Sequence, residues 1–123
     1  MADAKTILVV DDDPDVHFFC ETVLGAEGYK VIHASSGATG LAAARAQNPD
    51  LIVLDIMMEK IDSGYDVAER LGREKPIIMF SSAFNDSDQI FEPGSMPYAD
   101  ICRKPIEAEI LLLKIRKLLA PEE

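Results

Sequence analysis

The sequence predicts an α/β fold in which a parallel sheet is covered by helices on both faces. Five short apolar segments alternate along the chain with segments that have the apolar spacing of helices. Continuously apolar strands are typical of parallel sheets, because both faces of such a sheet are buried. With 123 residues, the chain has the size of one domain, so we expect a single domain over residues 1–123.

The first half of the chain contains three of the predicted strands and two helices. The first strand is an apolar run that ends in acidic residues, and the helix after it has apolar residues at the spacing i, i+3, i+4, i+7. Gly28 ends this helix, and Asn48-Pro49 ends the next one. We expect strands over 7–10, 29–34 and 51–54 and helices over 14–27 and 36–47.

The second half continues the same alternation with weaker signals. The fourth strand is continuously apolar, whereas the fifth is short and mixed in character. A short helix between them is cut by Pro93-Gly94. We expect helices over 65–74, 86–92 and 105–119 and strands over 76–80 and 98–103.

Composition excludes several classes of function. Acidic residues outnumber basic ones 22 to 12, giving a formal net charge of −10. Such a surface repels phosphate backbones, so we expect no direct binding to nucleic acid, whereas it suits a divalent cation. No signal peptide is recognisable and no apolar run approaches the roughly 18 residues that span a bilayer, so we expect no membrane association. Cys20 and Cys102 lack a CxxC spacing and are expected to be reduced core thiols of a cytoplasmic protein.

Acidic residues follow two of the predicted strands at the points where these strands end. Asp11, Asp12 and Asp13 follow the first strand, and Asp55 follows the third. Ligands of open parallel sheets bind outside the carboxyl ends of the strands, at the switch point. If the strand order is 2-1-3-4-5, the first and third strands are neighbours and these carboxylates converge on one edge.

That edge has the composition of a site for magnesium and a phosphoryl group. Clustered carboxylates without His or Cys are hard oxygen ligands, which suit Mg²⁺ better than zinc. A carboxylate that faces the metal, such as Asp55, can also act as a nucleophile and form an aspartyl-phosphate. Ser81 ends the fourth strand and Lys104 follows the fifth. Mg²⁺ and Lys104 would neutralise charge, and the Ser81 hydroxyl would donate a hydrogen bond to the phosphoryl group.

Not every aspartate at this edge fits the role of a ligand. Asp13 precedes Pro14, which is the arrangement of a helix N-cap followed by proline in the first helical position. Asp15 then lies in the first turn of the helix, where negative charge is favourable. We therefore assign Asp13 and Asp15 to the helix and Asp11 and Asp12 to the metal.

Taken together, these segments resemble the receiver domain of bacterial two-component response regulators. The resemblance covers essentially the whole chain. It rests on four motifs in the order and spacing of that family, namely ILVVDDDP at 7–14, DLIVLDIMM at 50–58, PIIMFS at 76–81 and KP at 104–105.

The resemblance implies a doubly wound (βα)5 fold, a flavodoxin-like three-layer sandwich with sheet order 2-1-3-4-5. It also implies that Asp11 and Asp12 hold Mg²⁺ together with Asp55, and that the backbone carbonyl of Met57 is a further protein ligand.

The resemblance further implies a phosphorelay function. Asp55 would accept a phosphoryl group from a histidine kinase or a phosphotransfer protein, while Ser81 and Lys104 would contact that group. Phosphorylation would then repack the face formed by the fourth helix, fifth strand and fifth helix, which binds a downstream protein. The expected role is thus that of a signalling module rather than an enzyme.

Three segments depart from the family pattern. The loop over 58–65 lacks the usual proline and has one extra residue. Ile101 stands three residues before Lys104, where the family often has Tyr or Phe, and the β-branched side chain is stiff at χ1. The segment 84–98 contains two prolines and a glycine where the family has a regular helix. We expect a partner or dimer geometry different from the commonest one.

Alternatives remain at two levels. The four consecutive apolar residues at 110–113 cover every side of a helix, so they indicate either a homodimer or partner face or scattered exposed leucines. At the level of function, the alternative is a pseudo-receiver that binds partners without phosphorylation. A phosphatase of the haloacid-dehalogenase type is a third reading, but it expects Thr or Val where Asp15 stands and a longer chain.

Overall fold

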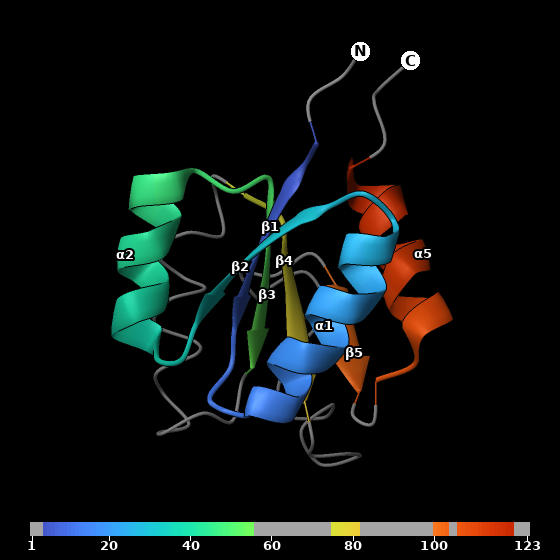
Figure 1. Ribbon diagram of the computed structural model, residues 1–123, viewed down its shortest axis with the longest axis horizontal. Helices are drawn as coiled ribbons and strands as arrows, with labels where there is room; N and C mark the ends of the chain where they lie inside the picture. Colours follow the sequence, from blue (N-terminus) through green and yellow to red (C-terminus); the bar gives the residue numbers. More distant parts are fainter. Residues whose placement is uncertain (1–3, 56–74, 82–99, 104–105, 120–123) are drawn as a thin grey trace.

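The computed structural model describes residues 4–55, 75–81, 100–103 and 106–119. Strands and helices alternate over residues 6–55 as the sequence predicts, and two further strands and a last helix follow among the described residues (Figure 1). The elements are β1 (Thr6–Val10), α1 (Pro14–Ala26), β2 (Lys30–Ala34), α2 (Gly37–Gln47), β3 (Leu51–Asp55), β4 (Ile77–Ser81), β5 (Asp100–Arg103) and α5 (Ala108–Leu119). The predicted helices over 65–74 and 86–92 lie outside the described residues.

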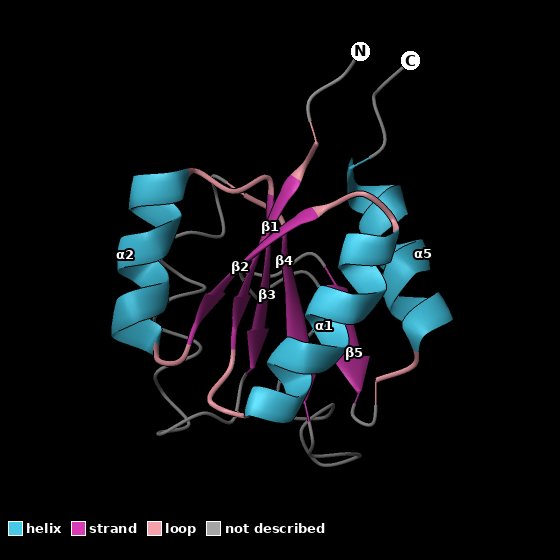
Figure 2. Cartoon of the chain, viewed as in Figure 1, coloured by secondary structure: helices cyan, strands magenta, loops and turns pink. Residues whose placement is uncertain are grey.

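The five strands form one parallel sheet in the order β2-β1-β3-β4-β5 (Figure 2). This is the predicted order 2-1-3-4-5, in which the second strand in the chain lies outside the first. The register pairs Val10 with Leu54 across β1 and β3, and Asp55 with Phe80 across β3 and β4. All the carboxyl ends therefore lie at the same edge of the sheet, with those of β1 and β3 adjacent.

The sheet is the middle layer of three. α2 packs on one face and α1 and α5 pack on the other (Figure 1). Successive residues of a strand point to opposite faces, so β1 supplies Leu8 and Val10 to the core under α2, and Ile7 and Val9 to the core under α1 and α5. All four side chains are fully buried, as the continuously apolar strand predicts.

The core under α1 and α5 also takes the two cysteines. Cys20 of α1 and Cys102 of β5 are buried thiols, which agrees with the assignment of both to the core. Among the described residues, no helix is long and apolar enough to cross a membrane.

The helices begin and end at residues that satisfy their terminal backbone groups. Ser36 is the N-cap of α2 and forms a capping box with Thr39. Asn48 ends that helix in the left-handed conformation, with φ of 51°. Gly28 has φ of 91° just after α1, a conformation that glycine adopts without strain.

The last helix begins later than the sequence predicts. α5 starts at Ala108, three residues after the predicted start at 105. The carbonyl oxygen of Glu107 accepts a hydrogen bond from the Leu111 N–H at 3.0 Å, which makes Glu107 the half-helical residue before the first turn. Ile106 instead packs against the core under α1 and α5.

Substitutions at two helical glycines, one close to the sheet and one in open space, can test how closely α2 packs on the sheet. A Cβ at Gly40 would lie 2.8 Å and 2.9 Å from the two methyl carbons of Val10, whereas one at Gly25 would meet nothing within 4 Å. Overpacking costs about 1–3 kcal/mol, while replacing a helical glycine by alanine gains about 0.5–1 kcal/mol. We predict that Gly40→Ala lowers the free energy of unfolding in urea by roughly 1–2 kcal/mol.

The matched variant Gly25→Ala is predicted to raise the free energy of unfolding by up to about 1 kcal/mol. Equal effects of the two substitutions would contradict the close approach of α2 to β1.

Candidate functional site

Three carboxylates meet at the carboxyl edge of the sheet. Asp11 follows β1 directly, and Asp55 is the last residue of β3. Because Val10 pairs with Leu54, the residues that follow each of them are neighbours across the two strands. One carboxylate oxygen of each of Asp11, Asp12 and Asp55 lies within 4.8 Å of the other two. The convergence expected from strand order 2-1-3-4-5 is therefore present.

The three carboxylates differ in burial. Asp11 and Asp55 are 1% and 3% exposed, whereas Asp12 is exposed. Two unit charges 4–5 Å apart repel by about 3–4 kcal/mol at an effective dielectric constant near 20, and water screens a buried pair poorly. A divalent cation held between these oxygens would remove this cost. The donor set is made only of carboxylate oxygens, which fits Mg²⁺.

The turn from β1 into α1 is held by backbone hydrogen bonds at Asp11. The Asp11 N–H donates to the carbonyl oxygen of Ala34 in β2 at 3.1 Å. The Asp13 N–H donates to Oδ1 of the Asp11 carboxylate at 2.9 Å. The backbone of the turn that follows Asp11 thus orients its buried carboxylate.

Asp13 caps α1, as the sequence predicts. Its side chain accepts a hydrogen bond from the Asp15 N–H at 2.9 Å, and Pro14 occupies the first helical position. Asp15 lies in the first turn of the helix. The described structure therefore divides the aspartates of the LVVDDDPD segment into a pair that joins Asp55 in the acidic cluster and a pair that belongs to the helix.

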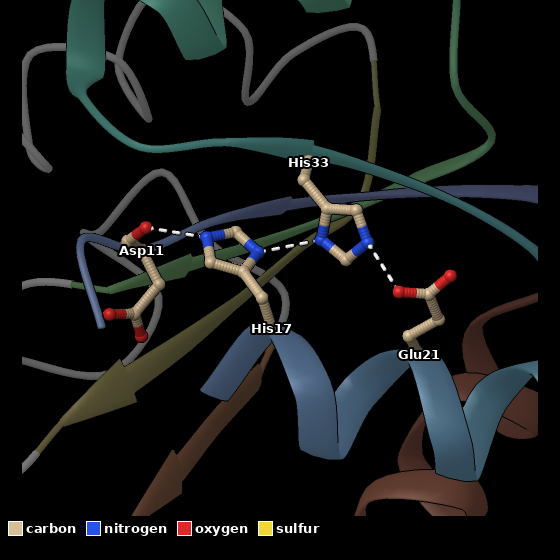
Figure 3. Close-up of polar contacts among 4 residues, drawn as sticks. All are labelled: Asp11, His17, Glu21 and His33. Atoms are coloured by element: carbon tan, nitrogen blue, oxygen red, sulfur yellow. Dashed lines mark hydrogen bonds and ion pairs between the residues drawn. The ribbon is translucent and has the colours of Figure 1, made fainter. Parts of the chain in front are cut away.

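Both histidines of the chain lie beside this turn (Figure 3). Nε2 of His17 lies 2.6 Å from the carbonyl oxygen of Asp11, and its Nδ1 lies 2.6 Å from Nδ1 of His33. Nε2 of His33 lies 3.3 Å from a carboxylate oxygen of Glu21. This series of contacts is not predictable from a motif, because neither histidine belongs to a recognisable one. The available signal was the alternation of β2, which places His33 on the same face of the sheet as Val31, the face under α1.

The remaining predicted site residues are placed less completely. Ser81 is the last residue of β4 and pairs with Arg103 of β5, so its backbone lies at the same edge of the sheet. Met57 and Lys104 lie outside the described residues. Their predicted roles as metal ligand and phosphoryl contact stay predictions.

Comparison with known proteins identifies the family. Residues 7–116 match the family described as the response regulator receiver domain. The chain belongs to this family. It is therefore a receiver domain of two-component signal transduction, and the resemblance inferred from its four motifs is confirmed.

Curated relatives of this receiver domain are regulators of about twice its length. It is 36% identical over 118 residues to the transcriptional regulatory protein AfsQ1 of Streptomyces coelicolor, covering 93% of this chain and 51% of that protein. It is 33% identical over 116 residues to the response regulator SaeR of Staphylococcus aureus, covering 92% of this chain and 50% of that protein. The chain thus spans about half the length of the curated relatives that it matches.

Solved structures confirm the fold. The beryllofluoride-activated receiver domain of RstA from Klebsiella pneumoniae superposes with a TM-score of 0.83 at 26% identity, covering 95% of this chain and all of that one. A CheY-like receiver domain protein from Methanospirillum hungatei gives a TM-score of 0.81 at 26% identity, covering 93% and 92% of the two chains. The predicted doubly wound, flavodoxin-like fold is confirmed.

The division of the aspartates can be tested with two substitutions. We predict that Asp13→Ala lowers the free energy of unfolding by about 1 kcal/mol, because α1 loses its cap, and leaves Mg²⁺ affinity unchanged. Asp12→Ala removes a proposed ligand and is predicted to weaken Mg²⁺ binding by more than about tenfold, which is what losing even an outer-shell partner can cost. Urea denaturation without metal and calorimetric titration with MgCl₂ measure the two quantities.

In metal-free buffer, Asp12→Ala is predicted to raise the free energy of unfolding slightly, because like charges are removed from the cluster. If both variants lose the same property, the assignment of Asp13 to the helix and Asp12 to the metal is wrong.

Proposed function

We propose that this receiver domain accepts a phosphoryl group on Asp55, with Mg²⁺ held by Asp11, Asp12, Asp55 and the backbone carbonyl of Met57. The observation that carries the proposal is the convergence of three carboxylates on one edge, two of them almost fully buried. A buried cluster of like charge is costly unless a cation or a reaction uses it.

Asp55 is the proposed nucleophile. A carboxylate oxygen of Asp55 forms a bond to phosphorus as the bond from phosphorus to the donor nitrogen breaks, with the phosphohistidine of a histidine kinase or a phosphotransfer protein as donor. Burial at the end of β3 keeps the reacting carboxylate positioned and shielded from bulk water. Bound Mg²⁺ would supply charge neutralisation at the phosphoryl oxygens.

Ser81 and Lys104 are the proposed contacts of the phosphoryl group. Ser81 ends β4, and the backbone of β4 lies on the side of β3 opposite β1. The Lys104 ammonium would balance the added negative charge. Phosphorylation, transmitted through these contacts, would shift the face that binds the downstream protein. We propose this shift as the output of the domain, which covers residues 1–123 and is proposed to be cytoplasmic.

α5 carries exposed apolar side chains that suit a partner surface. Leu111 and Ile115 are fully buried, whereas Ile110 and Leu113 are 45% and 65% exposed. The apolar residues of α5 therefore divide between core and surface, as the helix geometry predicts. A homodimer through α5 remains a proposal, with scattered surface leucines as the alternative.

The phosphoryl-acceptor role is tested by intact-mass measurement after incubation with Mg²⁺ and acetyl phosphate. We predict one added phosphoryl group on the wild-type protein and on the control Asp15→Asn, which changes an exposed carboxylate in the first turn of α1. Asp55→Asn is predicted to gain none, because it has no carboxylate nucleophile at the end of β3.

Two other results would overturn the proposal. If the wild-type protein gains no phosphoryl group and does not bind beryllofluoride, the chain is a pseudo-receiver that acts only by binding. Steady release of phosphate from phosphate esters would instead support the phosphatase.

A further inference from the structure

A chain of polar contacts runs from Asp11 to the outer side of α1. It begins at the Asp11 carbonyl oxygen, passes through the rings of His17 and His33, and ends at the Glu21 carboxylate (Figure 3). Two residues come from α1 and one comes from β2. These contacts therefore connect α1 and β2 to Asp11, the first residue of the acidic cluster.

The first contact has a defined direction. A carbonyl oxygen only accepts hydrogen bonds, so Nε2 of His17 must carry the proton and donate it to Asp11 at 2.6 Å. In the second contact, one Nδ1 donates and the other accepts, since two nitrogens without a proton repel each other. The donor at Nε2 is thus a requirement of the geometry.

This donor acts on the peptide that links the two metal-facing aspartates. The Asp11 carbonyl and the Asp12 N–H belong to one planar peptide unit, so fixing the carbonyl fixes the direction in which Asp12 leaves the turn. The Asp11 N–H is held by Ala34 and its Oδ1 by the Asp13 N–H. With His17 at the carbonyl, contacts hold the peptide groups on both sides of the Asp11 Cα as well as its side chain.

We propose that His17 is a positioning residue for the acidic pair, which orients the peptide between Asp11 and Asp12 for metal binding, and that His33 holds its ring in place. The inference rests on the proposed role of Asp11 and Asp12 as Mg²⁺ ligands. Partners that orient metal ligands commonly change affinity without touching the ion. Here the oriented group is the backbone between two ligands.

The effect of each residue on Mg²⁺ affinity should decline with its distance from Asp11 in this series of contacts. His17 touches Asp11 directly, and His33 acts only through His17. The contact between His33 and Glu21 joins side chains that are 33% and 70% exposed, and exposed pairs of this kind contribute little. We expect the order of effect on Mg²⁺ affinity to be His17, then His33, then Glu21.

Two substitutions of His17 separate positioning of the acidic pair from a simple tether between α1 and β2. The amide nitrogen of Gln lies the same number of bonds from Cα as Nε2 of His, so His17→Gln can still donate to Asp11. The amide nitrogen of Asn corresponds in the same way to Nδ1, so His17→Asn can still contact His33 but not Asp11. His17→Ala removes both contacts.

The first measurement is calorimetric titration of each variant with MgCl₂. One net hydrogen bond corresponds to a factor of roughly two to ten in affinity, so we expect His17→Ala and His17→Asn to raise the Kd for Mg²⁺ by that factor. His17→Gln is expected to restore a Kd within about twofold of wild type. His33→Ala should give an intermediate Kd, and Arg116→Ala, which breaks an ion pair with Glu27 between α5 and the C-terminal end of α1, should leave it unchanged.

The second measurement needs no metal. The amide exchange rate of Asp13 and the nitrogen chemical shift of the Asp12 amide report the geometry of the turn in the metal-free protein. We expect both to change in His17→Asn and to return toward wild-type values in His17→Gln.

The outcomes separate the two proposals. If wild type binds Mg²⁺ and the Gln and Asn variants bind it equally, or Asn is the better of the two, the positioning role of His17 is overturned while the proposed function stands. If wild type does not bind Mg²⁺ at all, the proposed function fails and the positioning role fails with it.

Discussion

The convergence of three carboxylates at one edge of the sheet is the constraint on which the proposed function depends. The oxygens of Asp11, Asp12 and Asp55 lie within 4.8 Å of one another, and two of the three residues are almost fully buried. Folding brings these charges together because the strands that lead to them are buried, β3 over its whole length and β1 from Ile7 to Val10. The hydrophobic burial of β1 and β3 thus holds the cluster in a state that favours a cation.

The elements around the edge contribute to this arrangement in different ways. α2 approaches β1 so closely at Gly40 that a Cβ there would lie 2.8 Å from a methyl carbon of Val10, the residue before Asp11. α1 begins beside the cluster at its N-cap, Asp13, and His17 of the same helix contacts the carbonyl oxygen of Asp11. Asp11 and Asp12 are therefore oriented by the turn between β1 and α1, while the core determines how near they lie to Asp55.

Much of the fold and part of the site could be predicted from the sequence, because the signals were local. Continuous apolar runs such as Leu51–Asp55 predict buried strands, and Asp13-Pro14 predicts a helix start. The start of α5 was predicted three residues early, since a proline is compatible both with a first turn and with the segment before it. The contact between His17 and His33 was not predictable in this way, because it depends on the packing of α1 against β2 and has no fixed spacing in the chain.

We propose that the buried cluster destabilises the metal-free domain and that Mg²⁺ removes this cost. The most direct test of this proposal is the free energy of unfolding of wild type as a function of MgCl₂ at constant ionic strength, with Asp11→Asn for comparison. The Asn side chain keeps an oxygen that can accept from the Asp13 N–H but carries no charge. We expect wild type to gain about 2.7 kcal/mol at a Mg²⁺ concentration one hundred times its Kd. Asp11→Asn is expected to be more stable than wild type without Mg²⁺ and to gain much less from it. A wild-type stability that does not depend on Mg²⁺, or an Asp11→Asn variant with an equal gain, would show that the cluster is not a Mg²⁺ site of this kind.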